Sequence, residues 1–377
     1  MTQSTIVLGL GGMGSATVYE LARRGTRAIG LERHGPAHAQ GSSHGKSRII
    51  RQAYFEDPAY VPLLLRAYER WRDFECECGA ELLTITGGLM IGAPGSEVLQ
   101  GSIRSAREYG LAHEVLESDA IRRRFPPLQT APHELGLYEA MAGFVRPEAS
   151  VAAYLARAEA HGAELHFGET ALSWEPRAGG VRVTTDRARY EADRLIVTAG
   201  PWLPELLGDL RLPLRVERQV LYWFAPRGGV APFLPDRFPI YIWEPRPGYA
   251  FYGFPHQEGA PGGVKIAFHT GGTPTDPHRI DREVHDAEIA AMREAFAERI
   301  PLLDGELLAT ATCMYTLTPD EHFAFGLHPQ HPQVVIASPC SGHGFKFVSA
   351  MGEVLADLGL TGATRHPIAP FALTRFA

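Results

Sequence analysis

The feature that most constrains the fold is a glycine-rich turn between two apolar runs near residue 10. The run 5–10 leads into Gly9-x-Gly11-x-x-Gly14, and Glu32 ends a second apolar run 18 residues after Gly14. In such a turn the first glycine permits a tight bend, the second lets backbone approach a pyrophosphate, and the third lets the helix pack on the strand. The following helix N-terminus supplies N–H groups for the phosphates. The segment therefore predicts a strand–helix–strand unit that binds a dinucleotide.

Glu32 narrows the choice of dinucleotide. A carboxylate at this position hydrogen-bonds a ribose diol and disfavours a 2′-phosphate, which argues against NADP and leaves NAD or FAD. A second buried strand, 194–199, turns sharply at Gly200-Pro201-Trp202. A strand–glycine element of this kind often passes the dinucleotide in two-domain flavoproteins, but it is equally typical of an ordinary strand and turn.

Short apolar strands near residues 5, 27, 165, 195 and 334 predict a parallel sheet assembled from the whole length of the chain. Between them, 82–91 indicates a pair of strands with a Gly-Gly turn, 249–253 and 264–269 a hairpin, and 281–298 an amphipathic helix. We expect a mixed α/β fold with a discontinuous Rossmann-like dinucleotide domain and an inserted antiparallel-sheet substrate domain. The predicted ranges are 1–84, 145–215 and 312–377 for the first domain, and 85–144 and 216–311 for the second.

The composition narrows the class of partner. The net charge of the 377 residues is −7, and the basic cluster 122–124 has no companion, which argues against nucleic-acid binding. No apolar segment approaches the ~20 residues of a membrane span, and an apolar strand starting at residue 5 leaves no room for a signal peptide. Four cysteines are too few for a disulfide framework, and Cys76-Glu77-Cys78 lacks further ligands for zinc. We expect a cytoplasmic protein without a metal.

Lysine is rare in this chain. Only Lys46, Lys265 and Lys346 occur among 36 basic residues. A GC-rich coding bias replaces lysine with arginine wherever a generic surface cation suffices, but a buried lysine can lose its proton and an arginine cannot. The three lysines are therefore candidates for roles that arginine cannot fill, although chance retention at the surface is the ordinary case.

Three further segments resemble the signature motifs of one enzyme family. They are GSSHGKSRIIRQAY at 41–54, CMYTLTPDEHF at 313–323 and SGHGFKF at 341–347. With the glycine turn and the strand 265–269, they occur in the family's order and at its spacing. The chain is similar, over essentially its full length, to the monomeric sarcosine oxidase and N-methyltryptophan oxidase family of FAD-dependent amine oxidoreductases. This resemblance implies FAD as the cofactor and makes the first predicted domain its binding domain.

The resemblance implies its most specific chemical role for Cys313. A lone cysteine is ordinarily a small buried hydrophobe, but in this family the matching cysteine holds FAD through a thioether to its 8α-methyl carbon. Because the thiolate is the nucleophile, a nearby cation must favour ionisation of the thiol. We expect covalent FAD at Cys313.

The resemblance also implies roles for four cations. Lys265 would lie beneath the flavin ring and activate dioxygen, because a fixed cation stabilises the charge that develops on dioxygen. Arg51 and Lys346 would bind the substrate carboxylate, the arginine as a bidentate fork and the lysine as a point charge. Arg48 would lie against the other face of the ring and support its reduced form.

Other site residues follow from the same motifs. His269 and Tyr252 match pocket residues near the substrate amine, and Tyr315 matches a residue close to flavin and substrate; outside the motifs, residues of these types are more often core. We expect Lys265, His269, Tyr252 and Arg48 to be catalytic. The expected contacts with FAD, besides Cys313, are Gly9, Gly11, Met13, Gly14, Glu32, Arg33, Ser42, His44, Arg48, Ile50, Ala199, Gly200, Trp202, Met314, Gly342, His343, Gly344, Phe345 and Lys346.

The chain departs from the family pattern at three places. Lys46 stands where relatives commonly carry an acidic residue, Ile242 replaces a methionine-like position in the strand 241–243, and the segment 256–263 is longer than expected. These departures affect the electrostatics of the 41–54 segment and the outer wall of the substrate pocket.

The resemblance implies an FAD-dependent oxidase of secondary amino acids that converts sarcosine to glycine, formaldehyde and hydrogen peroxide. We expect a monomer whose partners are a small amino-acid substrate and dioxygen, with activity that rises as the substrate amine deprotonates. One alternative is an oxidase of N-methyltryptophan, L-proline or L-pipecolate. Others are an NAD-dependent dehydrogenase, which has no use for Cys313 and Lys265, and a flavoprotein sensor that amines do not reduce.

Overall fold

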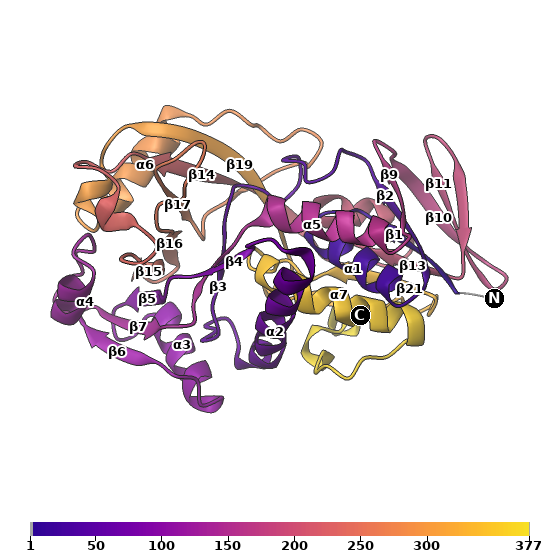
Figure 1. Cartoon of the computed structure of the whole chain (residues 1–377), viewed down its shortest axis with the longest axis horizontal. Coiled ribbons are helices and arrows are strands. Elements are labelled where there is room, and N and C mark those ends of the chain that lie inside the picture. Colours follow the sequence, from indigo (N-terminus) through magenta and orange to yellow (C-terminus); the bar gives the residue numbers. More distant parts are fainter. Residues whose placement is uncertain (1–2, 377) are drawn as a thin grey trace.

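The computed structural model describes residues 3–376, and its largest two sheets lie toward opposite ends of the long axis (Figure 1). We call the first of them the mainly parallel sheet. Its strands, in spatial order, are β20 (Ala324–Leu327), β21 (Val334–Ser338), β13 (Arg194–Val197), β1 (Ser4–Leu8), β2 (Arg27–Glu32) and β9 (Glu164–Phe167). All neighbours pair in parallel except β20 and β21. The parallel sheet expected from five distant strands is therefore confirmed.

Helices bury one face of this sheet. The helix α1 (Gly12–Arg23) follows the glycine turn and packs between α5 (Pro147–Ala160) and α7 (Val348–Thr361), as Figure 1 shows. The helix α2 (Val61–Cys78) packs on α7 through a stripe that repeats every three or four residues. That stripe consists of Val61, Leu64, Tyr68, Trp71 and Phe74. Gly79 ends α2 in the left-handed conformation, which glycine adopts without strain.

The second sheet is the large mixed sheet. Its order is β18 (Thr273–Pro274), β14 (Arg215–Phe224), β17 (Val264–Phe268), β16 (Tyr249–Gly253), β15 (Ile240–Arg246), β5 (Gly88–Gly92), β7 (Leu135–Glu139) and β6 (Glu114–Glu117), while β19 (Leu307–Leu317) pairs with β14. The expected hairpin of β16 and β17 is confirmed. The helices α3 (Glu97–Glu108), α4 (Ser118–Arg124) and α6 (Asp286–Phe296) belong to this end of the molecule (Figure 1). Because β19 extends toward the mainly parallel sheet, it carries side chains into the space between the two sheets.

The described part of the chain also forms two smaller sheets of three strands each. One consists of β10 (Ala171–Arg177), β11 (Gly180–Thr185) and β12 (Arg189–Ala192). The other consists of β3 (Arg48–Ile50), β8 (Gly143–Val145) and β4 (Leu83–Ile85). The strand β3 thereby holds the segment that carries Arg48 and Arg51 against the body of the protein.

Two local predictions were wrong. The segment 82–91 is not a strand pair, because β4 pairs with β8 whereas β5 pairs with β15 and β7. Gly87, at φ +72°, turns the chain from one sheet into the other. The helix predicted over 281–298 begins only at Asp286, because the carbonyls of Asp281 and Glu283 accept hydrogen bonds from Arg218 instead of from helical N–H groups.

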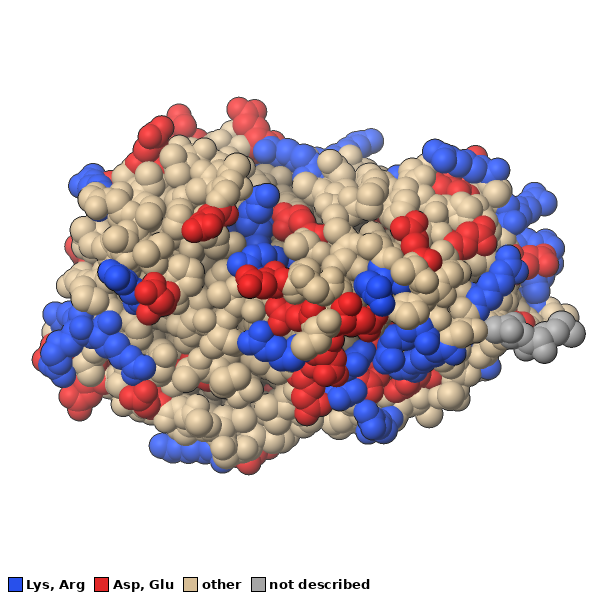
Figure 2. Space-filling view, in the orientation of Figure 1, with Lys and Arg blue, Asp and Glu red and all other residues tan. Residues whose placement is uncertain are grey.

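The mixed α/β architecture is as expected, and the domain boundaries remain a prediction. On the face seen in Figure 2, acidic and basic residues are interspersed. Within residues 3–376, no helix is both long and apolar enough to cross a membrane. No group of three or more His, Cys, Asp or Glu side chains in this described part could hold a metal ion.

Candidate active site

A long cavity runs between the glycine turn and the large mixed sheet. At one end it is lined by Glu32, Arg33 and the turn itself, and at the other by Arg51, His269 and Lys346. With its open mouth it contains about 1790 Å³ of space. The cavity extends from the glycine turn to the buried cations, so it is long enough to take a dinucleotide and a small substrate end to end.

The glycine turn has the geometry that a dinucleotide needs. Gly9 adopts φ +86°, and a Cβ at Gly14 would lie 1.8 Å from the Gly9 carbonyl oxygen. At Gly11 the nearest atom to such a Cβ is 3.6 Å away, so the cavity side of the turn is open. Thr198 Oγ1, at the end of β13, donates to the Gly9 carbonyl at 2.8 Å and fixes the turn. The N-terminus of α1 therefore faces a cavity that backbone can approach closely.

Glu32 is held ionised at the end of β2. Burial alone would raise its pKa, but the hydrogen bond from His38 and those from the backbone N–H groups of His34 and Leu10 lower it. The Leu10 amide donates to Oε2 at 2.8 Å and the His34 amide to Oε1 at 2.9 Å. A fixed carboxylate of this kind can accept from the hydroxyls of a ribose.

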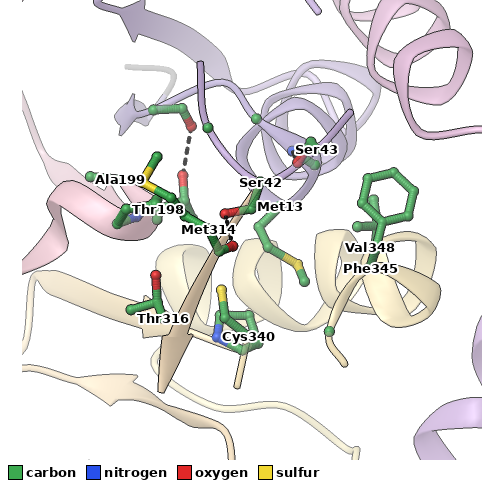
Figure 3. Close-up of a pocket in the computed structure, with 18 of the residues that line it drawn as sticks. Met13, Ser42, Ser43, Thr198, Ala199, Met314, Thr316, Cys340, Phe345 and Val348 are labelled. Atoms are coloured by element: carbon green, nitrogen blue, oxygen red, sulfur yellow. Dashed lines mark hydrogen bonds between the residues drawn. The ribbon is translucent and has the colours of Figure 1, made fainter. Parts of the chain in front are cut away.

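Cys313 lies where the 41–54 segment crosses β19. Arg48 Nη2 donates to the Ser42 carbonyl at 2.9 Å and lies 3.3 Å from Cys313 Sγ. Ser42 Oγ donates to the Met314 carbonyl at 2.7 Å, the contact drawn in Figure 3. Burial opposes ionisation of Cys313, but Arg48, His44 and then Lys265 outweigh it and lower the thiol pKa to about 6. Cys313 is therefore a thiolate at neutral pH, which makes it a nucleophile.

The far end of the cavity holds a buried ion pair beside a second cation. Arg51 is 1% exposed, and its Nη2 lies 2.5 Å from Glu56 Oε2. Burial would raise the pKa of Glu56, but Arg51 lowers it to about 2. Burial, with Arg51 as the next cause, lowers the pKa of Lys346 to about 7. A carboxylate that enters this end meets two cations in a low dielectric.

Three ring side chains line the cavity near these charges. The His269 ring centroid lies 6.2 Å from that of Tyr252 and 6.2 Å from that of Tyr315, edge-on to both. Burial lowers the pKa of His269 to about 4. At neutral pH His269 is therefore a neutral imidazole, which can accept a hydrogen bond from an amine.

Lys265 stands behind the 41–54 segment instead of on the cavity wall. Its Nζ donates to the carbonyls of Gly45 and Ser47 at 2.7 and 2.8 Å. Burial, followed by Arg48, lowers its pKa well below the usual range of lysine. Lys265 also lines a second cavity, together with Lys46, Glu148 and the 255–263 segment.

The long cavity brings together most of the predicted site residues. The predicted residues that do not line it are Gly14, His44, Ile50 and Lys265. Gly14 packs on the turn, and His44 acts on the Cys313 thiol from nearby.

Sequence reasoning missed Glu56, Tyr54, Ser43 and Glu148. Glu56 follows Arg51 by five residues, and a buried arginine needs an acidic partner, so the pair could have been expected. Ser43 accepts from the Gly12 amide at 3.0 Å, and Glu148 accepts from the Gly45 amide at 2.7 Å, but neither contact leaves a pattern in the sequence.

Unpartnered polar atoms show that the cavity fits a polar ligand. Four of the buried polar atoms without a partner in the described structure belong to residues that line it. They are Arg51 Nε, Glu56 Oε1, Trp202 Nε1 and Thr316 Oγ1. A buried group left without a hydrogen bond is costly, and native proteins usually satisfy it with a ligand or water. The glycine turn, the ribose acceptor and these atoms together fit FAD and a small carboxylate substrate.

This arrangement defines a dinucleotide-binding enzyme with room for a small carboxylate beside the dinucleotide. The sequence profile of the family described as FAD dependent oxidoreductase matches residues 4–358. The chain is 53% identical to a monomeric sarcosine oxidase of Streptomyces avermitilis, over 100% of this chain and 98% of that protein. It is 39% identical to a monomeric sarcosine oxidase of a Bacillus species, over 98% and 95%, and 32% identical to an N-methyl-L-tryptophan oxidase of Salmonella heidelberg, over the full length of both. The chain belongs to this family of FAD-dependent oxidoreductases, as its motifs predicted.

Solved structures agree with the fold. The amino acid oxidase NikD, described as essential for nikkomycin biosynthesis, has a TM-score of 0.84 and 27% identity, over 98% of each chain. An L-proline dehydrogenase from P. horikoshii has a TM-score of 0.85 over 100% of this chain and 98% of its own, at 21% identity. The second likeness supports the fold alone.

Proposed function

We propose that this enzyme oxidises sarcosine to glycine and formaldehyde, with dioxygen as the electron acceptor and hydrogen peroxide as the second product. The observation that carries the proposal is the pair of buried cations, Arg51 and Lys346, at the far end of a cavity that begins at the glycine turn. The two cations suit the carboxylate of an amino acid. The 53% identity to a monomeric sarcosine oxidase favours sarcosine among such substrates.

The first task of the chain is to bind and orient the substrate. Arg51 must exchange part of its pairing with Glu56 for the substrate carboxylate, and its unpartnered Nε is a donor that is already free. Lys346, from the C-terminal part of the chain, adds a second positive charge at the same end of the cavity. Held at its carboxylate, the substrate has its amine and N-methyl group directed along the cavity, and this fixed orientation supplies much of the rate.

The second task is to keep the amine neutral. His269 is uncharged at neutral pH, so it can accept a hydrogen bond from the amine without placing a like charge beside it. Tyr252 and Tyr315 line the same space, edge-on to His269. When bound in the cavity, FAD would supply the two-electron acceptor for oxidation of the N-methyl carbon, with dioxygen as the final acceptor. The imine product of the substrate then hydrolyses.

A substrate panel tests this function. We expect anaerobic mixing with sarcosine to bleach the flavin absorbance faster than mixing with N-methyltryptophan or L-proline. Peroxide formation in air should follow the same order. If N-methyltryptophan or proline reduces the flavin faster, the substrate assignment is wrong. If no secondary amino acid reduces it, the proposed reaction itself is wrong.

Cys313 is proposed to hold FAD through a thioether between Sγ and the 8α-methyl carbon. Its formation would replace a C–H bond of the methyl group by the C–S bond, with two electrons and two protons passing to dioxygen as hydrogen peroxide. The low thiol pKa and the adjacent Arg48 support this step, because attack requires a thiolate. We expect the wild-type enzyme to keep its yellow colour in guanidinium chloride, and Cys313→Ser to release it on unfolding. Cys340→Ser is the matched control, because burial raises the pKa of the Cys340 thiol to about 11. Release of all flavin from the denatured wild type would contradict the linkage.

The charge of Lys346 predicts how carboxylate binding depends on pH. Acetate carries the carboxylate of the substrate without its amine, so its affinity reports the cations alone. Because the pKa of Lys346 in the free site is about 7, binding above this pH requires uptake of a proton. The Kd of acetate is therefore expected to be constant just below pH 7 and to rise by up to tenfold per pH unit above it, until it reaches the value that Arg51 alone supports. Perturbation of the flavin absorbance measures the Kd, and Lys346→Met should flatten the profile.

A further inference from the structure

Tyr54 lies between the two cations of the carboxylate site. The Arg51 Cζ atom is 4.1 Å from the centroid of the Tyr54 ring, within the range of a cation–π interaction. Lys346 Nζ donates to the Tyr54 hydroxyl at 3.3 Å. The Tyr54 side chain is fully buried and does not line the long cavity. One residue behind the site therefore touches both groups that face the substrate.

The Tyr54 hydroxyl is itself oriented by a chain of hydrogen bonds. It lies 2.5 Å from His343 Nδ1, and His343 Nε2 lies 3.1 Å from the Glu321 carbonyl oxygen. Burial lowers the pKa of His343 to about 3, so the ring carries one hydrogen. Because a carbonyl only accepts, that hydrogen is on Nε2 and Nδ1 accepts from Tyr54. The hydroxyl oxygen of Tyr54 consequently presents its lone pairs to Lys346.

Lys346 needs such an acceptor because its surroundings oppose a positive charge. Burial and Arg51 both lower its pKa, whereas Glu56 opposes them. His343 and His269 also face this group of charges, and both are neutral. Apart from Tyr54, the hydrogen-bond acceptor of Nζ in the described structure is the His343 carbonyl, at 2.6 Å. Loss of the hydroxyl would leave the ammonium with one protein acceptor.

We propose that Tyr54 is the positioning residue for both carboxylate-binding cations, holding Arg51 on its ring and Lys346 at its hydroxyl, with His343 and the Glu321 carbonyl fixing the hydroxyl. The proposal rests on the proposed function, in which Arg51 and Lys346 bind the substrate carboxylate. It separates the two contacts by chemistry. The ring mainly serves the arginine, because Arg51 Cζ lies 4.1 Å from its centroid and Lys346 Nζ lies 5.1 Å away, and the hydroxyl serves the lysine alone.

Two variants test the two contacts separately. Tyr54→Phe keeps the ring and removes the hydroxyl, and we expect it to raise the Kd of acetate and the KM of sarcosine about tenfold while kcat changes less than twofold. Tyr54→Leu removes both contacts and should weaken acetate binding further. Anaerobic titration of the flavin absorbance gives the Kd without turnover.

Tyr60→Phe is the matched control. Tyr60 is also fully buried, and its ring centroid is 5.0 Å from that of Tyr54. Its hydroxyl lies 3.1 Å from His322 Nδ1 and accepts from the Phe323 amide, so it touches neither cation. A general loss of packing or buried hydrogen bonding should therefore affect both phenylalanine variants. The proposal requires the Kd of acetate to rise in Tyr54→Phe and to stay unchanged in Tyr60→Phe.

A direct measurement of Lys346 completes the test. With three lysines in the chain, protein labelled with [ε-13C]lysine gives few signals, and Lys346→Met assigns the relevant one. Tyr54→Phe should lower the pKa of Lys346, whereas Tyr60→Phe should leave it unchanged. If acetate binding and the Lys346 titration are the same in both variants, the role of Tyr54 is overturned. If acetate and sarcosine do not bind to the wild type, the proposed function is overturned with it.

Discussion

Lys265→Met is expected to slow the reaction of the reduced enzyme with dioxygen by about 10²- to 10³-fold, the usual cost of removing one preorganised donor from a developing negative charge. The reduction of the flavin by sarcosine under anaerobic conditions should stay within about twofold of wild type. Lys265 lies behind the 41–54 segment, where its charge acts on Cys313 and its Nζ donates to the Gly45 and Ser47 carbonyls, so its loss leaves the proposed carboxylate and amine contacts in place. Stopped-flow absorbance measures both half-reactions separately.

Lys46→Met is the control for this experiment. Lys46 is exposed and lines the second cavity with Lys265, but its side chain is not placed at the buried carbonyls of Gly45 and Ser47. We expect this variant to react with dioxygen at the wild-type rate. Equal rates for Lys265→Met and the wild type would remove Lys265 from the oxygen reaction. Equal slowing in both variants would assign the effect to the net charge of the region.

Arg51→Met is expected to have the second large effect. The variant loses a charge-assisted contact to the substrate carboxylate, and kcat/KM for sarcosine should fall about 10²-fold. It also leaves Glu56 buried without its partner, which costs about 3–5 kcal/mol of folding free energy. Without Arg51 the pKa of Glu56 rises above its unfolded value. The loss of stability should therefore be larger at pH 8 than at pH 5, where the carboxyl group can take up a proton.

The double variant Arg51→Met/Glu56→Leu separates binding from stability. Replacing a buried ion pair by apolar residues of similar volume is often neutral for folding. We expect the double variant to recover most of the thermal stability that Arg51→Met loses, with little dependence on pH. The affinity for sarcosine should not recover. Recovery of kcat/KM together with stability would show that Arg51 acts on the fold and not on the substrate.

Much of this fold could be predicted because its signals are local. The strands at residues 5, 27, 165, 195 and 334 are each short and apolar, and each lies in the mainly parallel sheet. The strand pair predicted over 82–91 was wrong because strand propensity does not indicate which neighbour a strand pairs with. In the structure, β4 and β5 belong to different sheets. The helix predicted from residue 281 lacks its first turn because Arg218, which is distant in the sequence, donates hydrogen bonds to the carbonyls of that segment.

In the candidate site, too, contacts between residues distant in the sequence could not be predicted. Motifs located Cys313, Arg51 and Lys346, because resemblance transfers position by position. Glu56 could have been expected as the partner of Arg51, five residues away, whereas Tyr54 was missed because its importance comes from folding beside Lys346, nearly 300 positions away. A cation needs an acceptor or a counter-ion when buried, but the sequence does not say which of many candidates supplies it. The covalent link, the cytoplasmic location and the monomeric state remain predictions.

The unequal burial of the three lysines has a practical consequence for anyone who attaches this enzyme to a surface. Lys265 and Lys346 are 1% and 5% exposed, whereas Lys46 is open to solvent. Coupling reagents directed at lysine side chains will therefore select Lys46. Its backbone, at φ +69°, is tied to Glu148 next to the segment that bears Arg48 and Arg51. Immobilisation through lysine side chains would fasten the molecule at the segment that bears Arg48 and Arg51, and an electrode or bead is better coupled through carboxylates.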